Sequence, residues 1–199
     1  MKCDIVLAGV GGQGVLSVAA AIASGAMEEK LCVKQAEVHG MAQRGGAVMA
    51  TLRLADHEIA SDLIPRGTAS MILSMEPMES LRYLAYLAPQ GALITSANPV
   101  RNIPDYPDLD ELLGRIRSLP RALCIDAERL ARAAGSARAA NMVMVGAAMH
   151  LLPIQPGIME TAVREIFARK GDDIVNINLR ALQAGRDAAR SGGEITGLH

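Results

Sequence analysis

The chain has 199 residues, half of them hydrophobic and 21% charged, so it is long enough to bury a sizeable core and too apolar to be disordered. Its 20 basic and 21 acidic residues leave a net charge of −1, and three tyrosines and one phenylalanine are its only aromatic residues, which argues against nucleic-acid binding. Its longest apolar tract, residues 15–27, is too short to cross a membrane, and the N-terminal apolar run stops at Gly9, too early for a secretory signal, so we expect a cytoplasmic protein outside the membrane.

The first part of the chain alternates between apolar runs and helical patterns. Residues 3–8 form a short apolar run that stops at a glycine, which predicts a buried strand, and the alanine-rich residues 15–29 predict a helix. Further strands are expected at 31–35, 47–54, 70–75 and 92–96. Residues 58–64 are ambiguous between a loop and a short edge strand paired with the third strand. A helix is expected over 77–87, since proline is well tolerated at a first helical position, and Pro89-Gln90-Gly91 should end it.

The second part of the chain becomes increasingly helical. Residues 98–107 contain three prolines and are expected to form an irregular loop. A helix over 109–117 and a strand over 122–125 follow, and Asp126 is suited to cap a helix that runs to Ala134. The last expected elements are helices over 141–152, 156–168 and 174–189. This order predicts one domain over residues 1–190, a three-layer α/β/α sandwich with a mainly parallel sheet and a helical C-terminal part; the glycine-rich residues 191–199 are expected to fray.

The first glycine segment, GVGGQG, lies between the first expected strand and the first expected helix. Gly9, Gly11 and Gly14 match the G-x-G-x-x-G spacing, with Gly12 and Gln13 between them. Glycine permits a tight turn and the close approach of a ligand, and free N–H groups at a helix start attract anions. Nicotinamide or flavin binding, binding of another anionic ligand and a purely structural turn all remain open, because the motif alone is weakly specific and Gln13 can donate to a neighbouring backbone as easily as to a ligand.

The second glycine segment, EVHGMAQRGG, is expected to be a long polar loop where a dinucleotide-binding fold would keep a short turn. Its functional side chains are Glu37, His39, Met41, Gln43 and Arg44. Glu37 lies near the position at which a nicotinamide enzyme carries the acid that binds ribose. His39 has no recognisable partner for general-base catalysis and no metal-ligand spacing, whereas Arg44 beside two glycines suits a carboxylate or a phosphate. The favoured interpretation is a protein–protein contact, where Met and Arg are enriched.

The three cysteines, Cys3, Cys32 and Cys124, are far apart in the sequence and form no C-x-x-C pair. Each lies in or beside an apolar run, which predicts buried thiols in a reducing compartment and neither a redox nor a metal role. An iron–sulfur cluster normally takes four cysteine ligands, so this chain cannot hold one by itself.

Several motifs together resemble one known family. GVGGQGVL, EVHGMAQRGG, the later EPMESLRYLAYL and the tail GDDIVNINLRALQAG resemble the gamma-type domain of 2-oxoacid:ferredoxin oxidoreductases, most nearly the type that forms the small (beta) subunit of the indolepyruvate enzymes. The likeness covers nearly the whole chain, and EVHGMAQRGG is far more specific than the glycine loop. The tail departs from the pattern, because the family often has Asn and an aromatic residue before a Gly, where this chain has Asn178-Leu179 and Gly185.

The resemblance implies a function that the residues alone do not. Such enzymes oxidatively decarboxylate a 2-oxoacid in the presence of coenzyme A, forming an acyl-CoA, CO2 and reduced ferredoxin. In the indolepyruvate type, thiamine diphosphate with its Mg and the iron–sulfur clusters are expected on the large (alpha) partner subunit, with coenzyme A as co-substrate. This chain has no recognisable thiamine-diphosphate motif and no identifiable catalytic residue, so it is expected to bind no cofactor alone and to be inactive alone.

The same resemblance gives each glycine segment a role. Residues 37–46 are expected to contact the large subunit near the mouth of its active site, and residues 9–14 either position an anionic part of coenzyme A or bind nothing. A chain made for a complex should expose an apolar patch, so self-association of the isolated chain is expected. A nicotinamide- or flavin-binding enzyme would instead bind its cofactor tightly alone, and a ligand-binding module would be stable and responsive without a partner.

Overall fold

The computed structural model describes residues 1–39 and 45–191, apart from the side chains of residues 38 and 39. Within these residues six strands form one sheet in the order β2-β3-β1-β4-β5-β6. The strands are β1 (Lys2–Val10), β2 (Cys32–His39), β3 (Ala47–Ala55), β4 (Ala69–Ser74), β5 (Leu87–Ser96) and β6 (Ala122–Ile125). β1, β4, β5 and β6 pair in parallel, and β3 is antiparallel to both of its neighbours, which confirms the mainly parallel sheet.

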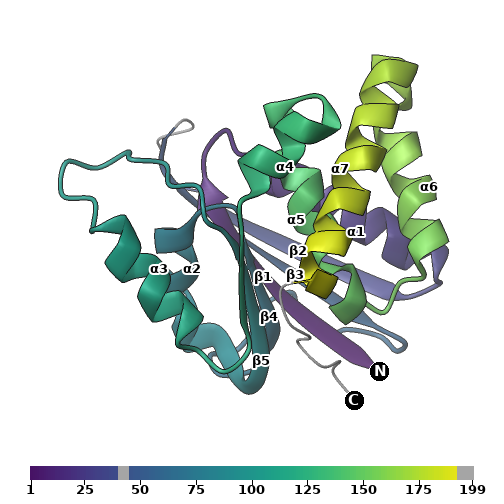
Figure 1. Cartoon of the computed structure of the whole chain (residues 1–199). Helices are drawn as coiled ribbons and strands as arrows, with labels where there is room; N and C mark the ends of the chain where they lie inside the picture. The colour runs from purple at the N-terminus through teal and green to yellow at the C-terminus, as the bar shows by residue number, and fades with distance from the viewer. Residues whose placement is uncertain (40–44, 192–199) are drawn as a thin grey trace.

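Helices cover both faces of this sheet, as the three-layer prediction requires (Figure 1). On one face lie α1 (Val15–Glu28), α4 (Ala127–Ala134), α5 (Ala140–Ala148), α6 (Pro156–Phe167) and α7 (Asp172–Ser191). On the other face lie α2 (Pro77–Arg82) and α3 (Leu109–Arg117). Alternate residues of β1 serve the two cores, because Ile5 and Leu7 are buried in the first hydrophobic cluster and Val6 in the second.

The first core is closed by an unusually tight crossing of α5 and α7. A Cβ added at Gly146 would lie 1.9 Å from the carbonyl oxygen of Leu182, and one added at Gly185 would lie 1.9 Å from that of Val143. The absence of a side chain at each glycine therefore lets the backbone of the opposite helix approach closely. This contact requires a residue without a side chain at position 185, which explains the glycine in the tail motif.

Three expected boundaries were wrong. β2 continues to His39 and forms an antiparallel hairpin with β3, so the second glycine segment begins inside a strand. The helix expected over 77–87 ends at Arg82, a short 3-10 turn follows, and β5 already starts at Leu87. Pro89 and Gln90 are exposed beside a register shift between β4 and β5, an irregularity that tolerates a proline unable to donate to the ladder.

Residues 58–64 do not pair with β3 as an edge strand. They run as irregular backbone tied to the β2–β3 hairpin by side chains: Arg53 donates to the carbonyl oxygens of Ser61 and Leu63, and Thr51 donates to that of Asp62. Side chains on β3 thus take the place of the backbone ladder that an edge strand would have formed. The expected tail beyond Ser191 lies outside the described residues.

Candidate functional site

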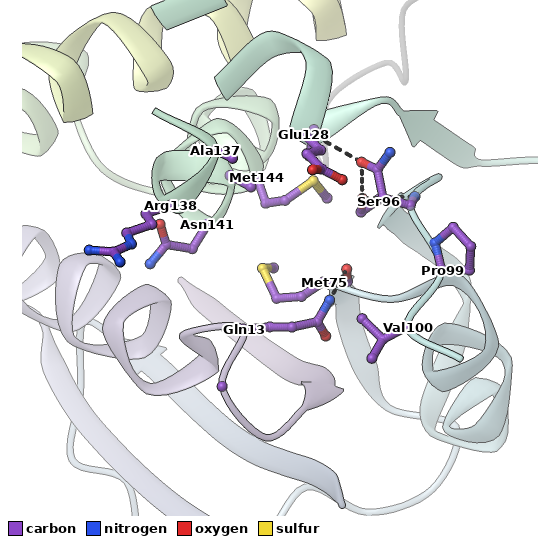
Figure 2. Close-up of a pocket in the computed structure, with 14 residues that line it drawn as sticks. Gln13, Met75, Ser96, Pro99, Val100, Glu128, Ala137, Arg138, Asn141 and Met144 are labelled. Atoms are coloured by element: carbon purple, nitrogen blue, oxygen red, sulfur yellow. Dashed lines mark hydrogen bonds between the residues drawn. The ribbon is translucent and has the colours of Figure 1, made fainter. Parts of the chain in front are cut away.

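The candidate site lies where the carboxyl ends of the parallel strands meet. The chain leaves β1 through α1 on one face of the sheet and leaves β4 through α2 on the other, so the two connections diverge between these adjacent strands. Open α/β sheets bind ligands at such a point of divergence. A cavity of about 230 Å³ opens there (Figure 2). It is lined by Gly12, Gln13, Met75, Ser96, Asn98, Pro99, Val100, Ala127, Glu128, Ala137, Arg138, Ala140, Asn141 and Met144.

The first glycine segment forms one wall of this cavity. Gly12 and Gly14 have positive φ angles of 104° and 79°, a conformation that favours glycine. Gly14 also caps α1, and among the described residues no side chain caps this helix end, so its first N–H groups are suited to an anion. A Cβ at Gly14 would lie 2.8 Å from the amide nitrogen of Asn141, which is therefore held against the start of α1.

The side chain of Gln13 serves the chain itself. Its Oε1 accepts from the backbone N–H of Val10 at 2.8 Å, and its Nε2 donates to the carbonyl oxygen of Met75 at 3.0 Å. These bonds tie the loop to the residue that follows β4. The sequence left open whether this glutamine would meet a ligand or a backbone, and its side chain meets the backbone.

The two glycine segments lie side by side. The backbone N–H of Gly11 donates to the carbonyl oxygen of Gly46 at 2.8 Å, which continues the antiparallel pairing of β1 with β3. Asn102, from the proline-rich loop after β5, donates to the carbonyl oxygen of Gly45 at 2.6 Å. Three loops distant in the sequence therefore meet close to Gly12 and Val100, which line the cavity.

The residues expected at a partner interface are only partly placed. Glu37 is exposed on β2 and accepts from Gln35 at 2.7 Å, and His39 ends that strand. Met41, Gln43 and Arg44 lie outside the described residues.

Two methionines and several polar groups complete the cavity. Met75 and Met144 face each other across it, with Arg138 and Asn141 on one side and Pro99 and Val100 on another (Figure 2). The thioethers are almost fully buried, Asn141 is 9% exposed, and Arg138 is exposed. The cavity therefore combines the guanidinium of Arg138, the carboxylate of Glu128, which is paired with Arg132, and the amide of Asn141 with an apolar floor.

Asn98 organises the opposite edge of the cavity. Its Oδ1 accepts from the hydroxyl of Ser96 and from the backbone N–H of Glu128, and its Nδ2 donates to Asp126 at 2.9 Å. Asp126 also caps α4 through the N–H of Arg129, as expected. Sequence reasoning missed Asn98, Arg138 and Asn141, although Asn98 could have been found as a polar residue just beyond a strand's carboxyl end.

A carboxyl group lies buried behind the cavity. Glu76 follows β4, is 0% exposed and caps α2 by accepting from the N–H of Glu79 at 2.8 Å. Its other oxygen accepts from the hydroxyl of Tyr106 and from the N–H of Val100. Burial raises the pKa of Glu76 above its usual value, although these donors favour the charged form.

The cysteines are less uniform than expected. Cys3 is buried, which raises the pKa of its thiol to about 12, and Cys124 is half-buried, but Cys32 is exposed on β2, so the prediction of three buried thiols was wrong. Across residues 1–39 and 45–191, no cluster of three or more His, Cys, Asp or Glu side chains is placed to hold a metal ion. In the same residues, no helix has the length and apolar character to span a membrane.

Comparison with known proteins identifies the family. The model of the pyruvate ferredoxin/flavodoxin oxidoreductase family matches residues 4–188. Among curated relatives, the indolepyruvate oxidoreductase subunit IorB of Archaeoglobus fulgidus is 39% identical over 96% of this chain and 98% of its own length. IorB of Thermococcus kodakarensis is 34% identical over 98% of each chain.

Solved structures share the fold. A keto/oxoacid ferredoxin oxidoreductase gamma subunit from Geobacter sulfurreducens superposes with a TM-score of 0.71 at 21% identity, covering 95% of this chain and 99% of its own. The 2-oxoglutarate:ferredoxin oxidoreductase of Magnetococcus marinus, solved with coenzyme A bound, gives 0.78 at 21% identity over all of this chain and 33% of its own. The resemblance seen in the glycine segments is confirmed, and the chain belongs to the pyruvate ferredoxin/flavodoxin oxidoreductase family.

Proposed function

We propose that this chain is the small subunit of an indolepyruvate-type 2-oxoacid:ferredoxin oxidoreductase, acting on indolepyruvate or a related aryl pyruvate in the cytoplasm. The observation that carries the proposal is the 39% identity to an IorB subunit over nearly the full length of both chains. The complex oxidatively decarboxylates the 2-oxoacid, transfers the acyl group to coenzyme A and passes the electrons to ferredoxin. This chain supports assembly and the positioning of coenzyme A, not the bond-making steps.

The large (alpha) subunit carries thiamine diphosphate, Mg and the iron–sulfur clusters in this proposal. The cysteines here support that division, because Cys3 packs into the core on one face of the sheet, Cys124 packs against the core on the other, and Cys32 is exposed on β2. The described residues also offer no grouping of metal ligands.

The cavity beside Gly12 is the proposed contact for coenzyme A. A phosphate of the coenzyme would face the start of α1, the amide of Asn141 and the guanidinium of Arg138, all of which favour an anion. A less polar part of the coenzyme would cover Met75 and Met144. The glycine loop contributes through its backbone, since the side chain of Gln13 is already engaged.

Arg138→Gln is expected to raise the KM for coenzyme A about 10-fold in the assembled enzyme, with kcat nearly unchanged, because a charge-assisted hydrogen bond to a phosphate acts equally on ground state and transition state. Steady-state kinetics at varied coenzyme A measure this. Arg190→Gln is the matched control, because Arg190 is also exposed but does not line the cavity. An unaltered KM in Arg138→Gln would remove this arginine from the coenzyme site.

Residues 37–46 form the proposed contact with the large subunit. Gly45 and Gly46 lie at the carboxyl edge of the sheet, bonded to Gly11 and Asn102 beside the cavity. Leu16 and Ile103 are each 41% exposed on the first turn of α1 and on the proline-rich loop. Exposed apolar side chains near a candidate contact segment are typical of a surface that a partner covers.

Reconstitution tests the proposed function. The isolated chain should self-associate in light scattering and show no turnover, whereas mixing it with the large subunit should give viologen reduction that requires both indolepyruvate and coenzyme A. Arg44→Ala should weaken subunit association or raise the KM for coenzyme A. Failure of the two subunits to associate, or saturable tight binding of a nicotinamide or flavin by the isolated chain, would reject the proposal.

A further inference from the structure

The loop between β5 and α3 is braced at several points although it contains no helix or strand. Pro99, Pro104 and Pro107 lack a backbone N–H, so this loop can make few hydrogen bonds of its own. Its shape depends instead on contacts to other segments. Pro99 and Val100 line the cavity, while Asn102 donates to the carbonyl oxygen of Gly45 at 2.6 Å.

Glu76 holds this loop from the protein interior. One oxygen of its carboxyl group caps α2, and the other accepts from both the N–H of Val100 and the hydroxyl of Tyr106. Capping alone needs only one acceptor, which Asn or Ser supplies without a buried charge. The second oxygen thus binds two points of the loop to one fully buried group.

These contacts close a ring of hydrogen bonds behind one wall of the cavity, the wall that Gln13, Met75 and Val100 line. From Glu76 the ring passes through Val100 and Tyr106 into the loop, and from Asn102 to Gly45. Gly45 donates to the carbonyl oxygen of Gly11 at 3.4 Å, and the glycine loop returns through Gln13 to Met75, the residue before Glu76. Each loop segment in the ring is therefore held by the segments next to it, and loss of one hydrogen bond loosens the others.

We propose that Glu76 is a positioning residue, which acts through Tyr106 to hold the loop of Val100 and Asn102 in the one geometry that binds coenzyme A. The inference rests on the proposed function, because it concerns how the same cavity meets its coenzyme. Glu76 itself touches no ligand in this scheme. It holds the wall of the cavity that includes Val100 in place before the ligand arrives, which lowers the entropy lost on binding.

Tyr106→Phe in the reconstituted complex tests the inference, because it removes only the hydroxyl that Glu76 accepts. The KM for coenzyme A should rise about 5-fold with kcat nearly unchanged, since the variant misplaces a binding wall without touching the chemistry. The midpoint of thermal unfolding should fall modestly, because the buried carboxyl group of Glu76 loses one of its donors. Asn102→Ala should raise the KM similarly. The double variant should show less than the product of the two effects, because both break the same ring.

Glu79→Gln is the matched control. Glu79 is 1% exposed on the same helix, and its side chain bonds to Arg82 at 2.9 Å instead of the loop. This variant should lower the unfolding midpoint and leave the KM for coenzyme A unchanged. An unchanged KM in Tyr106→Phe, or an equal rise in Glu79→Gln, would overturn the inference. Wild-type turnover that needs no coenzyme A would overturn the proposed function as well, so the two failures are distinguishable.

Discussion

Alanine in place of Gly146 is expected to lower the free energy of unfolding by more than about 3 kcal/mol, which places it among the largest effects of a single substitution in this chain. The added Cβ would lie 1.9 Å from the carbonyl oxygen of Leu182 and 2.8 Å from the carbonyl carbon. Backbone atoms cannot rotate away as a side chain can, so α7 would have to move off α5. Gly185→Ala should have the same effect from the other side, against Val143.

Urea unfolding of the isolated chain measures this, and Gly114→Ala is the control. Gly114 lies within α3, where an added Cβ would meet nothing within 4 Å. Alanine there should stabilise the chain by up to about 1 kcal/mol, because it favours helix over the unfolded state. Equal stability of the Gly146 and Gly114 variants would mean that α5 and α7 do not cross at these glycines.

Arg53→Met is expected to lower the free energy of unfolding by about 3 kcal/mol, because it leaves a buried carboxylate without its main partner. Asp4 is 1% exposed and accepts from two nitrogens of Arg53 at 2.9 and 3.1 Å. Lys2 lies 2.8 Å from the same carboxylate but is half-exposed, so it compensates only in part. The substitution also releases the carbonyl oxygens of Ser61 and Leu63.

The double variant Arg53→Met/Asp4→Leu separates the buried charge from the lost loop contacts. Replacing both members of a buried ion pair by apolar residues is often nearly neutral, so the double variant should recover most of the stability in urea unfolding. If it is as unstable as Arg53→Met alone, the loss comes from the bonds to residues 58–64 and not from the buried charge of Asp4 left without its main partner.

The order of the elements could be predicted because local patterns determine it. The strand over 122–125 and the helix over 109–117 have the predicted bounds, and α4 starts after Asp126, whose side chain caps it as expected. In each case the apolar spacing or the capping group acts within a few residues. The prediction was wrong where a distant partner decides: β5 starts at Leu87 because β4 lies beside it, although the preceding residues are suited to helix.

Only some residues of the candidate site could be predicted from the sequence. Gly12 and Gly14 could be singled out because a backbone with positive φ needs glycine, and this requirement is local. The polar groups Arg138 and Asn141, which line the cavity, lie on an otherwise apolar helical stretch and carry no local signal. Glu76 was visible only as part of a family motif, since its partners Val100 and Tyr106 come from a loop that follows the next strand.

The sequence by itself determined the family, the order of strands and helices and the two glycine segments, because specific strings and short-range periodicity encode them. Only the tertiary structure decided that Gly11 pairs with Gly46 and that Asn102 meets Gly45. Parallel strands bring their carboxyl ends to one edge whatever their separation along the chain, so the loops that follow them become neighbours. The cavity and the ring of hydrogen bonds beside it arise from that arrangement.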